Sequence, residues 1–244
     1  MESKVKETVT LSANLNYNNQ KINEGTLTFK IGNYEIGTVN VINGKAELNY
    51  TLDFNPGRYT LTASYSSENY NNLENTGTLI INRRNLNLIT NPIQSSLGEG
   101  ILITTNYYDE NGSSAIGITV MSVYIDNELI HSKASDTGQI STGYTIPTTT
   151  TLGTHIISIM LENSYYNTKS INTTLEVTKT TASSTIENIT GKINQTITLI
   201  ANISTPNQII NEGIVEFKIN NQIIGTQKVS ENIARLSYII PTTY

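Results

Sequence analysis

The chain has 244 residues, with 15 Lys and Arg against 20 Asp and Glu, no cysteine and only 14% charged residues. Without a basic excess or a basic run, the composition excludes a nucleic-acid partner and electrostatic attraction to an anionic membrane surface. The lack of cysteine excludes a disulfide framework and thiolate chemistry. A surface that is mostly uncharged and polar is typical of an exposed, non-catalytic module.

The N-terminus has no charged start followed by an apolar segment, and no run of 18 apolar residues occurs in the sequence. A run of that length is needed for a membrane-spanning helix, and a shorter apolar segment forms the core of an export signal. We therefore expect no signal peptide, no anchor and no membrane insertion in this segment.

The first predicted repeat comprises residues 1–83. Apolar or aromatic residues occupy every second position in several short segments, which is the period of a strand with one buried face. Met1–Glu7 leaves the first strand short or missing. Asn43–Gly44 is a strong hairpin signal, because both residues adopt positive φ at low cost. The strand-like segments are 9–15, 25–31, 33–37, 39–41, 46–52, 55–65 and 78–81.

The second predicted repeat, residues 84–179, follows this pattern more loosely and adds a full leading strand at Asn85–Ile89. The third, residues 180–244, has a leading strand near Thr185–Ile189 and then matches the first repeat closely. The pattern from Gly25 to Tyr50 returns from Gly213 to Tyr238. Self-similarity of this kind is the signature of a tandem array.

The third repeat stops at Pro241–Tyr244, before a counterpart of Gly57–Tyr59 appears. We therefore expect it to be truncated, with its last two strands missing. At roughly 1.5–3 kcal/mol for each large buried side chain, that loss exceeds the ~5–15 kcal/mol stability of a whole domain. Met1–Glu7 is too short to donate two strands to a neighbouring chain. The expectation is a fragment of a longer array, cut at both ends, whose third repeat does not fold fully alone.

The spacing of the strands predicts the fold class. About seven short strands in ~94 residues, with turns every 8 to 12 residues and no helical period, indicate an all-β protein of tandem immunoglobulin-like antiparallel β-sandwiches. Gly57-Arg58-Tyr59 adds the pattern of a tyrosine corner, in which the hydroxyl bonds back to the preceding backbone. The second repeat keeps the glycine as Gly153 but has His155 at the tyrosine position, which leaves its corner open.

The segments 25–31, 36–39, 46–50, 57–65 and 68–71 together resemble the bacterial-type Ig-like repeats of archaeal, methanogen-type adhesin-like surface proteins. The resemblance covers the first and third repeats well and the second more loosely. It implies a large exported protein of stacked repeats, displayed at the cell surface and supporting attachment. It also implies neighbouring repeats as partners, and it supplies no catalytic residue.

Reactive side chains are not grouped as an enzyme requires. The two histidines, His131 and His155, stand singly in strand patterns and are expected at the surface or the core edge. Asp109–Gly112 could offer oxygen ligands to calcium, but four adjacent residues cannot provide six to eight, which favours a solvated turn. We predict a chain that is not an enzyme, with no catalytic, cofactor-binding or metal-binding residue and no cofactor.

Two further sets of residues are candidates for surface chemistry. The pairs Tyr107–Tyr108 and Tyr165–Tyr166 could stack on sugar rings, although alternation in a strand places one of each pair in the core. The Asn-x-Ser/Thr pattern marks possible glycosylation, and the first and last of the six acceptors below fall on the outward phase of their strands. The six acceptors are Asn49, Asn111, Asn172, Asn188, Asn194 and Asn202.

The sequence thus favours a non-catalytic structural and display module, with adhesion implied by the resemblance alone. Two alternatives stay open. One is a module that binds a host or microbial surface glycan or protein through end loops such as Asn69–Asn75, with Tyr70 or Tyr166 in contact. The other is an accessory segment of an envelope enzyme whose catalytic domain lies outside this chain.

Overall fold

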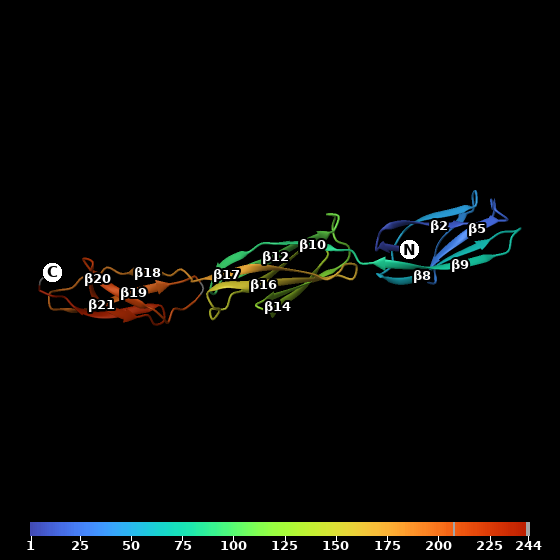
Figure 1. Ribbon diagram of the computed structural model, residues 1–244. Coiled ribbons are helices and arrows are strands. Elements are labelled where there is room, and N and C mark those ends of the chain that lie inside the picture. Colours follow the sequence, from blue (N-terminus) through green and yellow to red (C-terminus); the bar gives the residue numbers. More distant parts are fainter. Residues whose placement is uncertain (207, 243–244) are drawn as a thin grey trace. The chain divides into compact units, whose positions relative to one another are not determined.

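The computed structural model describes residues 1–206 and 208–242, and these residues form strands and turns with no helix. The protein is all-β and consists of tandem β-sandwiches, as the strand spacing predicts (Figure 1). By contacts the chain divides into two compact units. The first holds Met1–Asn91, Thr104–Thr142 and Ile157–Thr173, and the second holds Pro92–Ile103, Gly143–Ile156 and the residues from Thr174 onward. This division passes through the second predicted repeat, so the boundaries at 83/84 and 179/180 stay predictions.

The first repeat is built from a five-stranded sheet, a two-stranded sheet and a short hairpin. The five-stranded sheet has the order β1-β9-β8-β5-β6, in which the short β1 runs parallel to β9 and the other pairs are antiparallel. Its strands are β1 (Glu2–Lys4), β5 (Thr26–Ile31), β6 (Tyr34–Asn40), β8 (Gly57–Ser66) and β9 (Leu73–Asn82), while β2 (Thr8–Asn14) pairs with β7 (Lys45–Thr51) and β3 (Asn16–Tyr17) with β4 (Gln20–Lys21).

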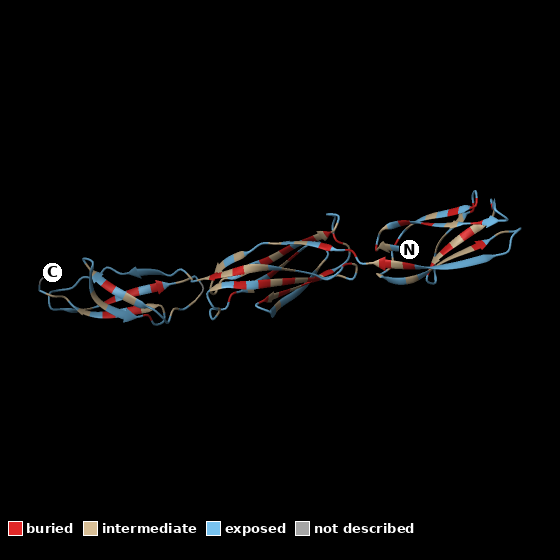
Figure 2. Cartoon of the chain, in the orientation of Figure 1, coloured by how far each residue is buried: buried red, intermediate tan, exposed pale blue. Residues whose placement is uncertain are grey.

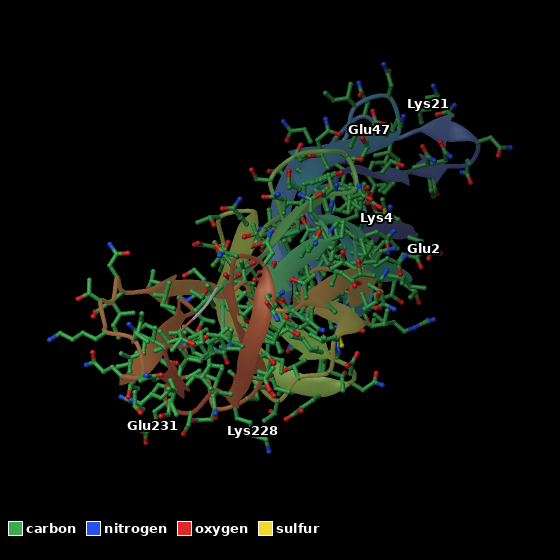
Figure 3. All side chains as sticks on the ribbon, turned by 90° about the vertical axis from the view of Figure 1, so that its left-hand side faces the viewer. Glu2, Lys4, Lys21, Glu47, Lys228 and Glu231 are labelled. Carbon is green, nitrogen blue, oxygen red and sulfur yellow. The ribbon has the colours of Figure 1, made fainter. Side chains whose placement is uncertain are left out.

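The core of the first repeat follows from the alternation of its strands. Along β5 the side chains of Leu27, Phe29 and Ile31 are buried, while those between them are partly exposed. Figure 2 shows the same alternation of buried and exposed positions on the strands. Charged side chains such as those of Lys21 and Glu47 lie at the outside, where they keep their hydration (Figure 3).

The prediction of a hairpin at Asn43–Gly44 is only half right. Both residues have positive φ, at 52° and 73°, as the turn requires. However, β6 and β7 belong to different sheets, and a single bridge between Ile42 and Lys45 is all that pairs the two arms. The chain crosses from one sheet of the sandwich to the other here. Residue alternation indicates a strand and its two faces, but it does not indicate which strand pairs with it.

The second repeat has a three-stranded sheet of order β10-β12-β15 and a five-stranded sheet of order β11-β17-β16-β13-β14. The predicted leading strand at Asn85–Ile89 is β10, which pairs antiparallel with β12. A further strand, β11, follows it and pairs parallel with β17. The strands are β10 (Leu86–Thr90), β11 (Ile93–Ser96), β12 (Gly100–Asp109), β13 (Thr119–Ile125), β14 (Glu128–Ser135), β15 (Gln139–Thr145), β16 (Gly153–Glu162) and β17 (Lys169–Thr178).

The third repeat has a three-stranded sheet of order β18-β19-β22 and a two-stranded sheet of β20 and β21. Its pairing of β20 with β21 reproduces that of β5 with β6, including the irregularity after the phenylalanine at Phe217 or Phe29. Its small core contains Phe217, Ala234 and Leu236. The strands are β18 (Ser183–Ile186), β19 (Thr196–Ser204), β20 (Ile214–Ile219), β21 (Gln222–Lys228) and β22 (Ile233–Ile239). The end of this predicted repeat at Thr243 and Tyr244 lies outside the described residues.

Candidate functional site

A buried ion pair stands at the start of the second repeat. Arg84 Nε lies 2.5 Å from Asp109 Oδ2, and Arg84 Nη2 lies 2.9 Å from Asp109 Oδ1, so the guanidinium donates in the bidentate geometry. The Tyr166 hydroxyl donates to Asp109 Oδ2 at 3.0 Å and accepts from the Ile116 amide at 3.1 Å. The three side chains come from segments far apart in sequence, and they hold the turn after β12 against the segment before β10.

The electrostatics of this cluster follow from its hydrogen bonds. The Arg84 guanidinium lowers the pKa of the Asp109 carboxyl below its ordinary value, against the opposing effect of burial. The hydrogen bond to Asp109 raises the pKa of Arg84. Burial raises the pKa of the Tyr166 hydroxyl. All three groups therefore keep their ordinary charge states at neutral pH, and none is set up to transfer a proton.

The same cluster contacts the first repeat within the first compact unit. Arg84 Nη1 lies 3.4 Å from the carbonyl oxygen of Val5, and Lys4 Nζ lies 2.6 Å from Glu110 Oε1. Beside them, the Arg84 amide donates to the Tyr165 carbonyl at 3.0 Å. The Tyr165 side chain packs against the core of the first repeat. The segment joining the first two repeats is therefore held by hydrogen bonds and packing on both of its sides.

The solvated turn predicted for Asp109–Gly112 is wrong for its first residue, since Asp109 is only 4% exposed. The Asn111 amide donates to Asp109 Oδ1, so the turn is closed by the carboxylate that the guanidinium holds. Sequence reasoning missed Arg84. The available signal was an adjacent pair of arginines in a chain with few charges, placed directly before a segment with strand alternation.

The tyrosine corner of the first repeat is confirmed, and the second repeat has an equivalent. The Tyr59 hydroxyl donates to the carbonyl oxygen of Asn55 at 2.8 Å. In the second repeat, His155 Nε2 lies 2.8 Å from the carbonyl oxygen of Thr151, which is also four residues upstream. A carbonyl only accepts, so the imidazole donates there as the phenol does in the first repeat.

Two exposed tyrosines meet at one end of the first repeat. The rings of Tyr17 and Tyr70 are edge to face with centroids 5.9 Å apart, and their side chains are 60% and 37% exposed. Asn69 Nδ2 donates to Glu24 Oε2 at 2.9 Å, which fixes the loop that carries Tyr70. An open groove of about 450 Å³ runs beside them and is also lined by Leu73. Aromatic faces beside amide groups suit contact with a polar ring that has apolar faces.

Sequence reasoning named Tyr70 but missed Tyr17. The tetrapeptide Asn-Tyr-Asn-Asn occurs twice, at 16–19 and at 69–72, and this repetition was the signal for the pair. Tyr166, the other tyrosine proposed for sugar contact, is 2% exposed and belongs to the ion-pair cluster. Tyr107 is also buried, while Tyr108 and Tyr165 are partly exposed, so one residue of each pair is in the core as expected. Tyr165–Tyr166 lies between β16 and β17 and not inside a strand.

The remaining predicted residues are not brought together. His131 is exposed on β14 and His155 is buried on β16, in agreement with the expected surface and core-edge positions. All six predicted glycosylation acceptors are exposed, and Thr10 Oγ1 donates to the side chain of Asn49. Their modification stays a prediction.

Neither a metal site nor a membrane helix is found in the described residues. No three His, Asp or Glu side chains there lie together as metal ligands would. The described part of the chain also has no helix with the length and apolar character that a membrane crossing requires.

Comparison with known protein families gives a sequence match for the first repeat only. Residues 1–82 match the family model of the bacterial Ig-like domain (group 3). The first repeat is therefore similar in sequence to a bacterial Ig-like domain. No curated protein matches it in sequence. The match covers one repeat of the chain and does not bear on the archaeal source that the resemblance suggests.

Several solved structures align with the chain, all with low TM-scores. A tetra-tandem repeat from the extending region of a large adhesion protein has 13% identity and a TM-score of 0.41, and the alignment covers 98% of this chain and 63% of that one. A three-Ig fragment of titin has 13% identity and a TM-score of 0.37 over 98% of this chain and 84% of its own. The Yersinia pseudotuberculosis adhesin InvE has 14% identity and a TM-score of 0.37 over 72% and 56%. At these scores the likenesses carry no argument about function.

Proposed function

We propose that the chain is a non-catalytic structural module of a cell-surface, adhesin-like protein, in which stacked Ig-like repeats support attachment by displaying other parts of the molecule. The observation that carries this proposal is the Arg84–Asp109–Tyr166 cluster together with the Val5 carbonyl. A repeat that transmits force needs a segment to its neighbour that does not swing freely. Here that segment is held by a bidentate ion pair that is almost fully removed from water.

The organisation of the reactive groups supports the same proposal. The perturbed pKa values of Arg84, Asp109 and Tyr166 arise from mutual hydrogen bonds and burial, and all three side chains are buried. Structural ion-pair networks perturb pKa values as active sites do, and location separates the two cases. The accessory-segment alternative has no structural observation in its favour, and the sequence of the flanking gene tests it.

Single-molecule force spectroscopy on the 244-residue chain, held by handles at its two ends, tests the proposal. We expect the first and second repeats to unfold in separate cooperative events, each releasing the length of one repeat. Arg84→Met should lower the force needed for the event that breaks the cluster, while Arg58→Met, on the exposed end of β8, should not. Continuous extension at low force, without discrete unfolding events, would contradict the proposal that the repeats transmit force.

The paired tyrosines favour a second candidate function, which is recognition of a surface glycan by the end groove of the first repeat. Saturable binding on a glycan array, lost in both Tyr17→Ala and Tyr70→Ala, would support it. Tyr34→Ala is the matched control, because Tyr34 is 71% exposed and lies outside the groove. Binding that survives both groove substitutions, or no binding at all, would exclude this function.

Glycosylation of the exposed Asn-x-Ser/Thr sites belongs to the same surface proposal, because glycans would shield an envelope-exposed repeat. Peptide mass spectrometry of the native protein is the test. We expect occupancy at one or more of the six sites, and six bare asparagines would remove the proposal.

A further inference from the structure

The third repeat presents a sheet edge that its two sister repeats cover. In the first repeat, β5 pairs with β6 on one side and with β8 on the other. In the second repeat, β13 pairs likewise with β14 and β16. In the third repeat, β20 pairs with β21 only, and the described residues 1–206 and 208–242 place no strand on its other edge.

Burial shows that this edge borders an open apolar face. Leu27 and Ile31 on β5 are 3% and 0% exposed, whereas their counterparts Val215 and Ile219 are only partly buried. Beside them an open groove of about 720 Å³ reaches into the small core. Its apolar lining includes Ile189, Ile197, Leu199, Val215, Phe217 and Tyr238.

Among its described residues, the third repeat also has a second unpaired segment, which lies directly before the turn at Asn194. Lys6, Gly98 and Asn194 occupy equivalent turns with φ of 61°, 78° and 63°. Each donates its amide to the carbonyl oxygen of the residue directly after a strand of the partner sheet, namely Leu52 after β7, Ile146 after β15 and Ile240 after β22. In the first two repeats, the residues before this turn are β1 and β11, which pair parallel with β9 and β17.

The residues before the turn of the third repeat, 189–192, therefore stand where β1 and β11 stand. The Lys192 amide donates to Gln195 Oε1 at 2.8 Å, just as the Lys4 amide donates to Glu7 Oε2 at 2.9 Å. Yet Ile193 is 61% exposed, while its counterpart Val5 is fully buried. The turn is formed and its neighbouring strand is not among the described residues.

We propose that this face of the third repeat is the acceptor site for a two-stranded β-hairpin of the repeat's own type. One strand lies antiparallel along the free edge of β20, and the other lies parallel to residues 189–192. The hairpins β8–β9 and β16–β17 fill the corresponding faces of the sister repeats and define the occupant's chemistry. The hairpin that binds here must not already be paired within a complete β-sandwich. A folded second copy cannot supply it, because both of its hairpins are already paired.

Side-chain size makes the site selective. In the first repeat, Phe29 on β5 stands opposite the small Ala63 on β8. In the second, the smaller Val123 stands opposite the larger Ile159. The third repeat has Phe217 at this position, so it demands a small residue from the hairpin, because overpacking a core pair is destabilising. A hairpin of the β8–β9 type should therefore fit, and one of the β16–β17 type should not.

The test adds synthetic peptides to the whole 244-residue chain and follows hydrogen exchange by mass spectrometry. The peptide 56–82 should slow the exchange of residues 189–192 and 214–219 and leave β5 unchanged. It should bind at least about tenfold more tightly than the peptide 152–178 from the second repeat. The peptide 56–82 carrying Ala63→Leu should bind about tenfold more weakly than the unmodified peptide 56–82. This peptide variant tests the size match without altering the fold of the protein.

A protein variant gives an independent control. Val215→Lys introduces a charge at a half-buried position of the groove and should abolish the protection, while Thr226→Lys, at an exposed position of β21 outside the groove lining, should not. No change in exchange with the peptide 56–82, or equal affinity for both hairpins, would overturn the proposal. Protection that is present without peptide and grows with protein concentration would also overturn it, since a second copy would then be the occupant.

Discussion

The first and third repeats have nearly the same strand pattern and differ in what their shared positions contact. Phe29 and Phe217 are both buried, at 2% and 3% exposure, because each packs across the sandwich on the strands that both repeats possess. Ile31 and Ile219 differ, because the strand that covers Ile31 has no counterpart among the described residues of the third repeat. Local alternation thus forms the strand, and strands distant in sequence decide how much of its face is removed from water.

The largest expected effect comes from truncating the shared phenylalanine. Phe29→Ala should lower the free energy of unfolding of the first repeat by about 3–5 kcal/mol, because it leaves a cavity in a closed core. Phe217→Ala should cost the third repeat less, since water can enter from the open groove. Denaturant unfolding of the two variants, followed by exchange in each repeat, measures both losses. Equal losses would contradict an open third sandwich.

The next effect concerns the start of the second repeat. Arg84→Met leaves the Asp109 carboxylate buried without its partner, which should cost about 3 kcal/mol. Arg84→Met combined with Asp109→Leu should recover much of that loss, because it removes the uncompensated charge. Thermal unfolding of the single and double variants provides the measurement. A double variant no more stable than the single one would contradict this account, because the uncompensated charge would then not be the source of the loss.

The start of the third repeat can be compared with the start of the second, because neutral groups hold it in place of an ion pair. There the Thr180 hydroxyl donates to the Leu97 carbonyl at 2.7 Å and accepts from Gln208 Nε2 at 3.1 Å. Thr180→Val should therefore have a smaller effect than Arg84→Met, of about 1 kcal/mol. A larger effect from Thr180→Val would contradict this ranking.

Acid should lower the stability of the first repeat more than that of the third, because of one residue in an equivalent turn. The Ser3 hydroxyl and the Lys4 amide hold the pKa of Glu7 below its ordinary value, whereas Gln195 stands at the same place in the third repeat. A lowered folded pKa gives stability that is present above the unfolded pKa of about 4.3 and lost as pH falls through the folded value. The first repeat should weaken below about pH 4, and Glu7→Gln should reduce that dependence. Unfolding curves at stepwise lower pH test it.

Much of this fold could be predicted from the sequence, and the failures share one cause. Alternation located the strands, and Gly57-Arg58-Tyr59 located the corner. The Asn43–Gly44 hairpin was half right, and the solvated turn at Asp109 was wrong. Both depend on a neighbour that spacing does not specify, namely which sheet β7 joins and which cation faces the carboxylate. The Tyr17–Tyr70 pair was missed for the same reason, since its two loops meet only in the folded sandwich.

The smallest expected effect is at the tyrosine corner. Tyr59→Phe removes one hydrogen bond at a partly exposed site and should cost about 0.5–1.5 kcal/mol. His155→Phe in the second repeat removes the equivalent bond from a buried side chain and should cost at least as much. Denaturant midpoints of the two variants provide the comparison. A corner bond without structural value would leave both midpoints unchanged.

Hydrogen exchange of the unmodified chain tests the central claim most directly, by comparing β20 with β5 and residues 189–192 with β1. The account predicts that the amides of Ile214–Ile219 and 189–192 exchange at least about tenfold faster than their counterparts in the first repeat, at every protein concentration. Equal protection of the two repeats in a monomeric chain would mean that the third sandwich is already closed, and that result would contradict the account.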